Sequence, residues 1–230
     1  MPDNWMMVQE WQDVLFLHWP VAAEQLRKQI PEELELDLHK GEAWVGVVLF
    51  KAKGTRLRLL PPVPGTRTFL EVNVRTYVKY NGKSGVYFFS LDASSQLAVK
   101  AASLGDFLPY RLARMEFFKR GQEKTFKSRR IDEKSFPETI GLSYQIISNP
   151  IERTSLEQWL TERYCLWTKP KGKLLRVDIK HFPWELQYVK GEIRHNSMAS
   201  FLPENLHHEE PLAHYSSMKK VHFYPPVIEK

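Results

Sequence analysis

One predicted hairpin constrains the fold of this chain more than any other sequence feature. Residues 69–80 are rich in Val, Thr and Tyr, which favour strands. The dipeptide Asn81-Gly82 follows directly and is typical of a two-residue hairpin turn, and residues 86–91 supply the return strand. The sequence therefore predicts an antiparallel pair within a sheet of similar pairs.

The first strand of this hairpin has two chemically different faces, because side chains alternate along a strand. One face is apolar and needs a core. The other carries Glu71, Asn73 and Arg75, which are a carboxylate, an amide and a guanidinium. Alternation alone favours a solvent-exposed position for this polar face.

Strand patterns recur along the rest of the chain, and helical patterns are few and short. Further strands are predicted at 14–19, 34–38, 43–51, 114–119, 124–131, 142–148, 164–168, 174–180, 185–193 and 215–224. Helices are predicted at 22–30, 94–104 and 155–163, the last capped by Thr154 or Ser155. This pattern predicts an α+β fold around a mainly antiparallel, closed or partly closed sheet. Since no linker is visible, we expect residues 1–230 to form a single domain.

Charge and cysteine content exclude several function classes. The formal net charge is +6, but basic and acidic residues are interleaved, so no nucleic-acid-binding surface is predicted. The lone Cys165 cannot form an internal disulfide and fits a reducing compartment. The first residues lack the apolar core of a signal peptide, and no apolar run is long enough to cross a bilayer. We therefore expect a cytoplasmic protein that does not contact a membrane.

Seven sequence blocks spread over most of the chain resemble the YqjF-like family of uncharacterised bacterial proteins. They include FLHWPV, GEAWVGVVLF and EVNVRTYV in the first half and RYCLWT and HFPWELQ in the second. The full set lies at residues 16–21, 41–50, 71–78, 85–93, 108–110, 163–168 and 181–187.

A more distant resemblance is to acetoacetate decarboxylase, over residues 26–37 and 71–111. That family has a Glu ten residues before the Asn-Gly turn, matched by Glu71, and a Pro-Lys-Lys that aligns with Pro109. The two lysines are replaced by Tyr110 and Arg111. The resemblance implies a cone-shaped, mainly antiparallel β-barrel flanked by short helices, with a ligand cavity inside it.

The replaced lysines argue against the reaction of that family. Its chemistry needs a neutral lysine amine that attacks a ketone to form a Schiff base. A tyrosine cannot form an iminium, and Arg111 stays protonated at any useful pH. Lys79 and Lys100 lie nearby in sequence but are expected to be solvated. Acetoacetate decarboxylase activity is therefore not expected.

The resemblance places the Glu71 face inside the barrel, which reverses the expectation from alternation. Glu71 and Tyr110 are then the candidate catalytic residues. The candidate ligand-binding residues are Asn73, Arg75, Arg114, His181 and Trp184. Arg75 suits a carboxylate or phosphate, because a guanidinium binds such groups with two hydrogen bonds. Three structural alternatives stay open: an internal Glu71–Arg75 ion pair, a Tyr110 that only packs in the core, and a structural His181.

No metal site or cofactor is predicted. The residues His207, His208, Glu209, Glu210 and His214 contain metal-ligand types, but their spacing matches no known zinc pattern, and a solvated loop is the preferred interpretation. Cys165 is expected to be a small core residue.

Three hypotheses for the function follow from these residues. The leading one is a protein that binds or transforms a small polar or anionic organic molecule in the barrel, without Schiff-base chemistry. The second is a structural or interaction protein whose barrel is filled by its own side chains. The third is a lyase or hydratase in which Glu71 is the acid/base and Tyr110 a hydrogen-bond donor. The ligand identity and a homo-oligomeric state are left open by the sequence.

Overall fold

The hairpin predicted from the sequence is present. In this computed structural model, which describes residues 4–61, 67–102, 107–132, 137–202, 206 and 209–229, strand β4 (Thr68–Tyr80) pairs antiparallel with β5 (Lys83–Ala93). Asn81 and Gly82 form the turn with φ angles of 48° and 76°, a left-handed conformation that Asn and Gly adopt readily. The predicted antiparallel pair is confirmed.

The other elements alternate between long strands and short helices. In chain order they are β1 (Met7–Val21), α1 (Ala23–Arg27), β2 (Glu35–Leu36), β3 (Ala43–Leu57), α2 (Gln96–Ala102), β6 (Tyr110–Arg120), β7 (Glu123–Arg130), β8 (Thr139–Ile146), α3 (Ser155–Thr161), β9 (Cys165–Thr168), β10 (Leu175–Lys180), β11 (Gln187–Asn196), β12 (Leu212–Phe223) and β13 (Val227–Ile228).

Nine strands close into a barrel. Hydrogen-bonded neighbours run β5-β6-β7-β8-β11-β12-β1-β3-β4, and the pairing of β4 with β5 closes the ring. All of these pairs are antiparallel except β5–β6, which is parallel. The barrel with its few short helices is the mainly antiparallel α+β architecture that the sequence predicts.

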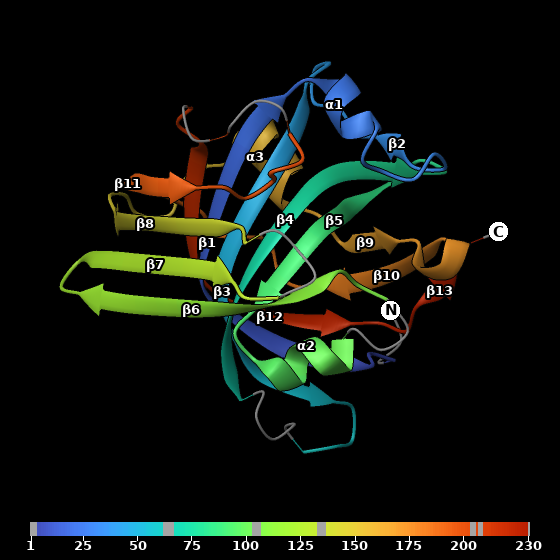
Figure 1. The fold of residues 1–230 in the computed structure, drawn as a ribbon, viewed down its shortest axis with the longest axis horizontal. Helices are drawn as coiled ribbons and strands as arrows, with labels where there is room; N and C mark the ends of the chain where they lie inside the picture. Colours follow the sequence, from blue (N-terminus) through green and yellow to red (C-terminus); the bar gives the residue numbers. More distant parts are fainter. Residues whose placement is uncertain are drawn as a thin grey trace.

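A second ring of strands uses part of the same barrel. Strand β9 pairs with β5 at Val86 and Tyr87, β10 pairs with β9, and the end of β10 pairs with the end of β12. Strands β12, β1, β3, β4 and β5, which we call the common wall, therefore belong to both rings. Figure 1 shows β6, β7, β8 and β11 on one side of this wall and β9 and β10 on the other.

The common wall buries both of its faces. Leu15 of β1 and Val72 of β4 point into the nine-stranded barrel, where they pack with Phe126 of β7. On the opposite face, Phe16 of β1 packs against Trp184 in the segment before β11. Because β4 belongs to this wall, its polar face is covered by protein, and the solvent exposure that alternation alone favours does not occur. The expected position inside the barrel is corrected as well: Val72 faces the interior of the nine-stranded barrel, so Glu71 faces the second ring.

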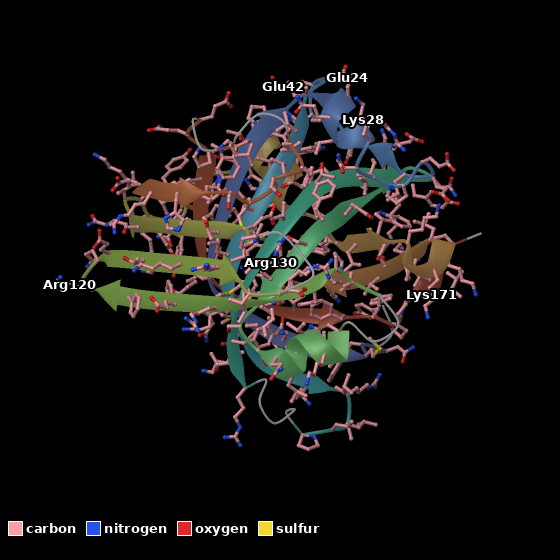
Figure 2. All side chains as sticks on the ribbon, viewed as in Figure 1. Glu24, Lys28, Glu42, Arg120, Arg130 and Lys171 are labelled. Atoms are coloured by element: carbon pink, nitrogen blue, oxygen red, sulfur yellow. The ribbon has the colours of Figure 1, made fainter. Side chains whose placement is uncertain are left out.

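A buried ion-pair network joins β5 to β7 near the middle of the molecule. The Arg130 guanidinium lies 2.8 Å from an Asp92 carboxylate oxygen and 2.6 Å from a Glu138 oxygen. Figure 2 labels Arg130 in this central position and Arg120 at the tip of the β6–β7 hairpin. The hairpin therefore has a buried, anchored base and an exposed tip.

Several elements differ in length from their prediction. Helix α1 ends at Arg27 rather than at residue 30, and residues 28–30 form a turn before Pro31. Strand β1 is longer than residues 14–19 and contains an irregularity at Asp13, whose φ is 51°. Strand β2 covers only Glu35 and Leu36. None of the helices in the described part of the chain has the length and hydropathy needed to span a bilayer.

Candidate functional site

The polar face of β4 is buried on the face of the common wall that looks toward β9 and β10. The exposed fractions of Glu71, Asn73 and Arg75 are 3%, 5% and 8%. Each lies opposite an apolar or small residue of β3, as in the Glu71–Phe50 and Arg75–Gly46 pairs. The strand alternation thus points a carboxyl, an amide and a guanidinium into one interior region.

Glu71 and Tyr110 are in contact. The Tyr110 hydroxyl donates to Glu71 Oε2 at 3.3 Å, from the first residue of β6. Burial raises the pKa of Glu71 to about 8, although hydrogen bonds from Tyr110 and Asn73 oppose the shift, and the charge of Asp92 adds to it. Glu71 is therefore mainly a neutral carboxylic acid at pH 7.

Arg75 is buried without a carboxylate partner among the described residues. Its guanidinium lies over the rings of Phe16 and Tyr77, 5.8 Å from each centroid, and Nη2 donates to the Leu160 carbonyl at 3.4 Å. Arg163 lies over the other side of this region, 4.9 Å from the Tyr77 ring, but it forms an ion pair with Asp37. The internal Glu71–Arg75 pair that the sequence left open is not formed.

His181 and Trp184 reach the same region from the segment before β11. The Trp184 ring lies 4.9 Å from the ring of Phe16 and 5.0 Å from that of His181. The pKa of His181 is lowered by burial, and the charge of Arg75 contributes to the shift. The Trp184 indole Nε1 has no hydrogen-bond partner within the described chain. Phe16 therefore connects these two residues to Arg75.

Two buried histidines in this region were not among the predicted site residues. His18 and His214 are both 0% exposed, and they lie on the adjacent strands β1 and β12. Burial lowers the pKa of His18 well below its usual value, and the charges of Arg75 and His214 lower it further. His18 gave a weak signal, because a histidine in an apolar strand more often has a structural role. His214 was expected in a solvated loop, and this was wrong, because β12 begins at Leu212 and buries it.

We call the six residues His18, Glu71, Asn73, Arg75, Tyr110 and His214 the polar cluster. Several of its buried polar atoms have no hydrogen-bond partner in the described part of the protein. They are both ring nitrogens of His18, Asn73 Oδ1, Arg75 Nε and His214 Nδ1. Native proteins leave few buried polar atoms unpaired, so this concentration makes the polar cluster the candidate site.

A surface pocket of about 500 Å³ lies beside the polar cluster. It opens where β6 and β9 diverge from β5, and Pro109 and Arg111, on either side of Tyr110, line it. Phe88 also lines the pocket and is the strand partner of Arg75. The remaining lining residues are Gln29, Tyr87, Phe89, Leu108, Thr168, Lys169, Pro170 and Phe201. None of the polar cluster residues lines this pocket, so the pocket reaches the cluster only through their neighbours in sequence and strand register.

Arg114 does not join the polar cluster, contrary to the prediction. The β5–β6 pairing ends at Leu112, so β6 then extends away from the common wall with β7. Arg114 is exposed there and lines a separate depression of about 230 Å³ with Arg129 and His195. The same strand face that carries Tyr110 toward Glu71 therefore turns to solvent four residues later.

The remaining chemical candidates are placed as follows. Cys165 is buried, and burial raises the pKa of its thiol to about 11, which makes it unreactive. Lys100 is exposed, and Lys79 is partly buried beside the hairpin turn. His207 and His208 lie outside the described residues. Within the described ranges no three His, Cys, Asp or Glu side chains are grouped closely enough to hold a metal ion.

Comparison with known proteins supports a shared fold. The chain is 44% identical over 227 residues to the uncharacterized protein YqjF of Bacillus subtilis (strain 168), covering 97% of this chain and 93% of that protein. An acetoacetate decarboxylase-like enzyme from Sphingomonas wittichii RW1 superposes with a TM-score of 0.68 at 10% identity, over 100% of this chain and 94% of that one. The enduracididine biosynthesis enzyme MppR, in a complex with pyruvate, superposes with a TM-score of 0.64 at 11% identity, over 99% and 91%.

The structural matches show an acetoacetate decarboxylase-like fold, and at these identities they show the fold alone. The predicted YqjF-like relationship is confirmed by the 44% identity. The family model for DUF2071, an uncharacterized conserved protein, matches residues 8–220. The chain therefore belongs to the DUF2071 family.

Proposed function

We propose that the protein binds a small organic anion at Arg75, within the polar cluster, without forming a Schiff base. The observation that carries this proposal is the buried Arg75 guanidinium, which has no carboxylate partner among the described residues and an unpartnered Nε. A bound anion would supply both the missing countercharge and the missing hydrogen bonds.

The neighbours of Arg75 leave its charge unneutralised. Glu71 is mainly protonated at pH 7 because burial raises its pKa to about 8. Burial lowers the pKa of His18, and the nearby Arg75 acts in the same direction, so this imidazole is neutral. An unpaired buried charge costs several kcal/mol. An anion that enters this region is therefore favoured over an empty one.

The surrounding groups define the class of ligand. Unpartnered atoms of His18, Asn73 and Trp184 offer hydrogen bonds to a second polar group, such as a carbonyl or hydroxyl. The rings of Phe16 and Tyr77, each 5.8 Å from the guanidinium, supply aromatic walls beside it. These features favour a short carboxylate that carries an oxygen function, and MppR, which shares the fold, has been seen in complex with such a compound, pyruvate.

Entry of the ligand is proposed to proceed through the surface pocket. Its cationic residues Arg111 and Lys169 attract an anion. Their charges are partly neutralised by ion pairs, that of Arg111 by Asp132 and that of Lys169 by Glu33. Movement of the Phe88 side chain would then open the way from the pocket to Arg75. The protein is proposed to act in the cytoplasm, where a reduced Cys165 is expected.

Ligand-induced stabilisation tests this function. Wild type, Arg75→Met and Arg114→Met are heated with pyruvate, acetoacetate or phosphate, and with uncharged amide analogues. An anion at 100 times its Kd stabilises the folded state by about 2.7 kcal/mol, which raises the Tm of a chain of this size by roughly 5–10 °C. We expect this rise in wild type and in Arg114→Met, whose charge change is the same but lies away from the cluster, and none in Arg75→Met.

The ligand-free Arg75→Met variant supplies an internal check. Its melting temperature should equal or exceed that of wild type, because an unpaired buried charge is replaced by an apolar side chain. If no anion stabilises the wild type, or if anions stabilise Arg75→Met equally, the binding hypothesis is wrong. The hypothesis of a region filled by its own side chains would then stand.

Glu71 supports a second candidate, an acid/base enzyme such as a lyase or hydratase. A carboxyl with a pKa of about 8 exchanges protons near neutral pH, and Tyr110 is placed to donate a hydrogen bond beside it. A Glu71→Gln variant that still binds the anion but turns over none of it would support this candidate. Equal turnover in both proteins would exclude it.

A further inference from the structure

Glu157 and His214 form a buried pair on the side of the polar cluster formed by α3 and β12. His214 Nε2 lies 2.9 Å from Glu157 Oε1. The other carboxylate oxygen of Glu157 accepts hydrogen bonds from the backbone N–H (2.7 Å) and hydroxyl (3.0 Å) of Thr154, in the capping box of α3. Burial opposes ionisation of Glu157, but the Thr154 and His214 interactions outweigh it and lower its pKa. Glu157 is therefore a fixed carboxylate.

This pair sets the tautomer of His214. A carboxylate only accepts hydrogen bonds, so Nε2 must carry the proton and Nδ1 is left with its lone pair. Nδ1 has no hydrogen-bond partner in the described chain. Burial lowers the pKa of His214 although Glu157 raises it, so the ring is neutral near pH 7. A neutral, carboxylate-oriented imidazole with a free lone pair is the arrangement of a general base.

The free nitrogen belongs to the side of β12 that faces the anion site. His214 is the strand partner of Phe16, over whose ring Arg75 lies. His18, two residues further along the same face of β1, is influenced by the charges of both Arg75 and His214. The strand register therefore brings the base, a second neutral imidazole and the unpaired guanidinium into one region.

We propose that His214, oriented by Glu157, removes a proton from the organic anion bound at Arg75, an inference that rests on the proposed function. The substrate class is a carboxylate with an acidic C–H beside a carbonyl. The C–H bond breaks, its electron pair forms the enolate, and the proton moves to Nδ1. The imidazolium then pairs with Glu157, and the enolate charge lies near Arg75. Return of the proton, or of a deuteron from solvent, to carbon restores both partners without an oxidant or reductant.

Glu157 is a positioning residue in this proposal, and His214 is the catalytic residue. The structural alternative is that the pair only joins α3 to β12. The two differ in pH dependence. Among the described residues, the titratable and charged groups around His214 are Glu157, His18 and Tyr188, with Arg75 beyond His18. A base at His214 is already deprotonated at pH 7, so its rate stays level from pH 7 to 9. A base at Glu71 gains rate as the pH rises through about 8.

The experiment follows loss of the pyruvate methyl proton signal in D₂O by NMR, with the melting temperature as a separate measure of binding. Wild type should exchange the methyl protons faster than buffer, with a level rate from pH 7 to 9. His214→Gln should lower the rate by about 10²–10⁴-fold, with the pyruvate-induced rise in melting temperature retained. Glu157→Gln should lower the rate because the tautomer of His214 is no longer fixed, while the pyruvate-induced rise in melting temperature is retained. Its rate should still be level from pH 7 to 9, because loss of the Glu157 charge lowers the pKa of His214 further. Arg114→Met should match wild type.

The outcomes separate the two proposals. If wild type binds pyruvate but does not exchange its methyl protons, the proposed role of His214 as a base is wrong, and the proposed anion site at Arg75 still stands. Exchange by His214→Gln at the wild-type rate also overturns it. If pyruvate does not stabilise wild type, the proposed anion site is wrong, and the proposed base at His214, which depends on that site, is wrong as well. Loss of exchange in His214→Gln with binding retained is the result that the proposal requires.

Discussion

At the scale of single residues, the protonation state of Glu71 decides what the interior can do. Glu71 lies two positions from Arg75 on the same strand face and forms no ion pair with it. Burial raises the pKa of Glu71 to about 8, so at pH 7 the region contains a neutral acid and a cation without a carboxylate partner in the described chain. Tyr110, which replaces the lysine of the decarboxylase pattern, only donates a hydrogen bond to Glu71. The site is therefore suited to binding an anion and not to forming an iminium.

The Glu71 shift makes a prediction about stability. A carboxyl with a raised folded-state pKa stabilises the native protein below its unfolded pKa, near 4.5, and that stabilisation is lost as the pH rises through about 8. Between these values the free energy of unfolding of wild type should fall by about 1.4 kcal/mol per pH unit from this group. Glu71→Gln cannot ionise and should lack this component. Urea unfolding at pH 5 and pH 8 measures the difference, and parallel pH dependences in the two proteins would contradict the assigned shift.

At the scale of elements, α3 is short but holds Glu157 in place. Its capping box joins the Thr154 hydroxyl to the Glu157 N–H at 3.3 Å and the Glu157 carboxylate to the Thr154 N–H. A helix of seven residues has little intrinsic stability, so α3 is stabilised by its cap and by its packing on the common wall.

Removal of this cap should therefore be measurable. We expect Thr154→Ala to lower the free energy of unfolding by about 1 kcal/mol, because the N-terminal N–H groups of α3 lose their acceptor. Ser155→Ala, at the adjacent exposed position, should change it by less than about 0.5 kcal/mol. Equal effects in chemical denaturation would show that the capping box does not stabilise α3.

Comparison of the elements with their sequence patterns shows what local information can predict. The β4–β5 hairpin was predicted because alternation and an Asn-Gly turn are local signals. The closure of β9 and β10 across the common wall was not, because it depends on pairings such as Val86–Leu166 between distant residues. For the same reason Arg114 was misplaced, since no local signal shows where β6 leaves β5. His18 and His214 were missed because only the strand register brings them together.

At the scale of the whole molecule, two rings that share one wall explain how a single chain buries a polar region beside an apolar core. The nine-stranded barrel is packed with apolar residues, which bury one face of the common wall. Its other face is then free to carry the polar cluster. Continuous hydrogen bonding through thirteen strands of the described chain supports the proposal that residues 1–230 are a single domain.

The contact of β5 with β9 leaves no space for a side chain at Gly85. A Cβ added at Gly85 would lie 2.6 Å from Cys165 Sγ and 2.8 Å from Trp167 Nε1. Gly85→Ala should therefore push β9 away from β5 and lower the free energy of unfolding by about 1–3 kcal/mol. Ser84→Ala, at the exposed neighbour, is the matched control. A Gly85→Ala protein as stable as this control would mean that the second ring is not closed here.

The central claim is that Arg75 is a buried anion-binding residue, and anomalous diffraction from crystals soaked in sodium bromide tests it most directly. Bromide is a small anion whose position is visible without any assumption about the natural ligand. We expect an anomalous peak in contact with the Arg75 guanidinium in wild type and no such peak in Arg75→Met. Bromide found only at exposed cations such as Arg114 and Arg129, with the Arg75 guanidinium closed off by protein side chains, would contradict it.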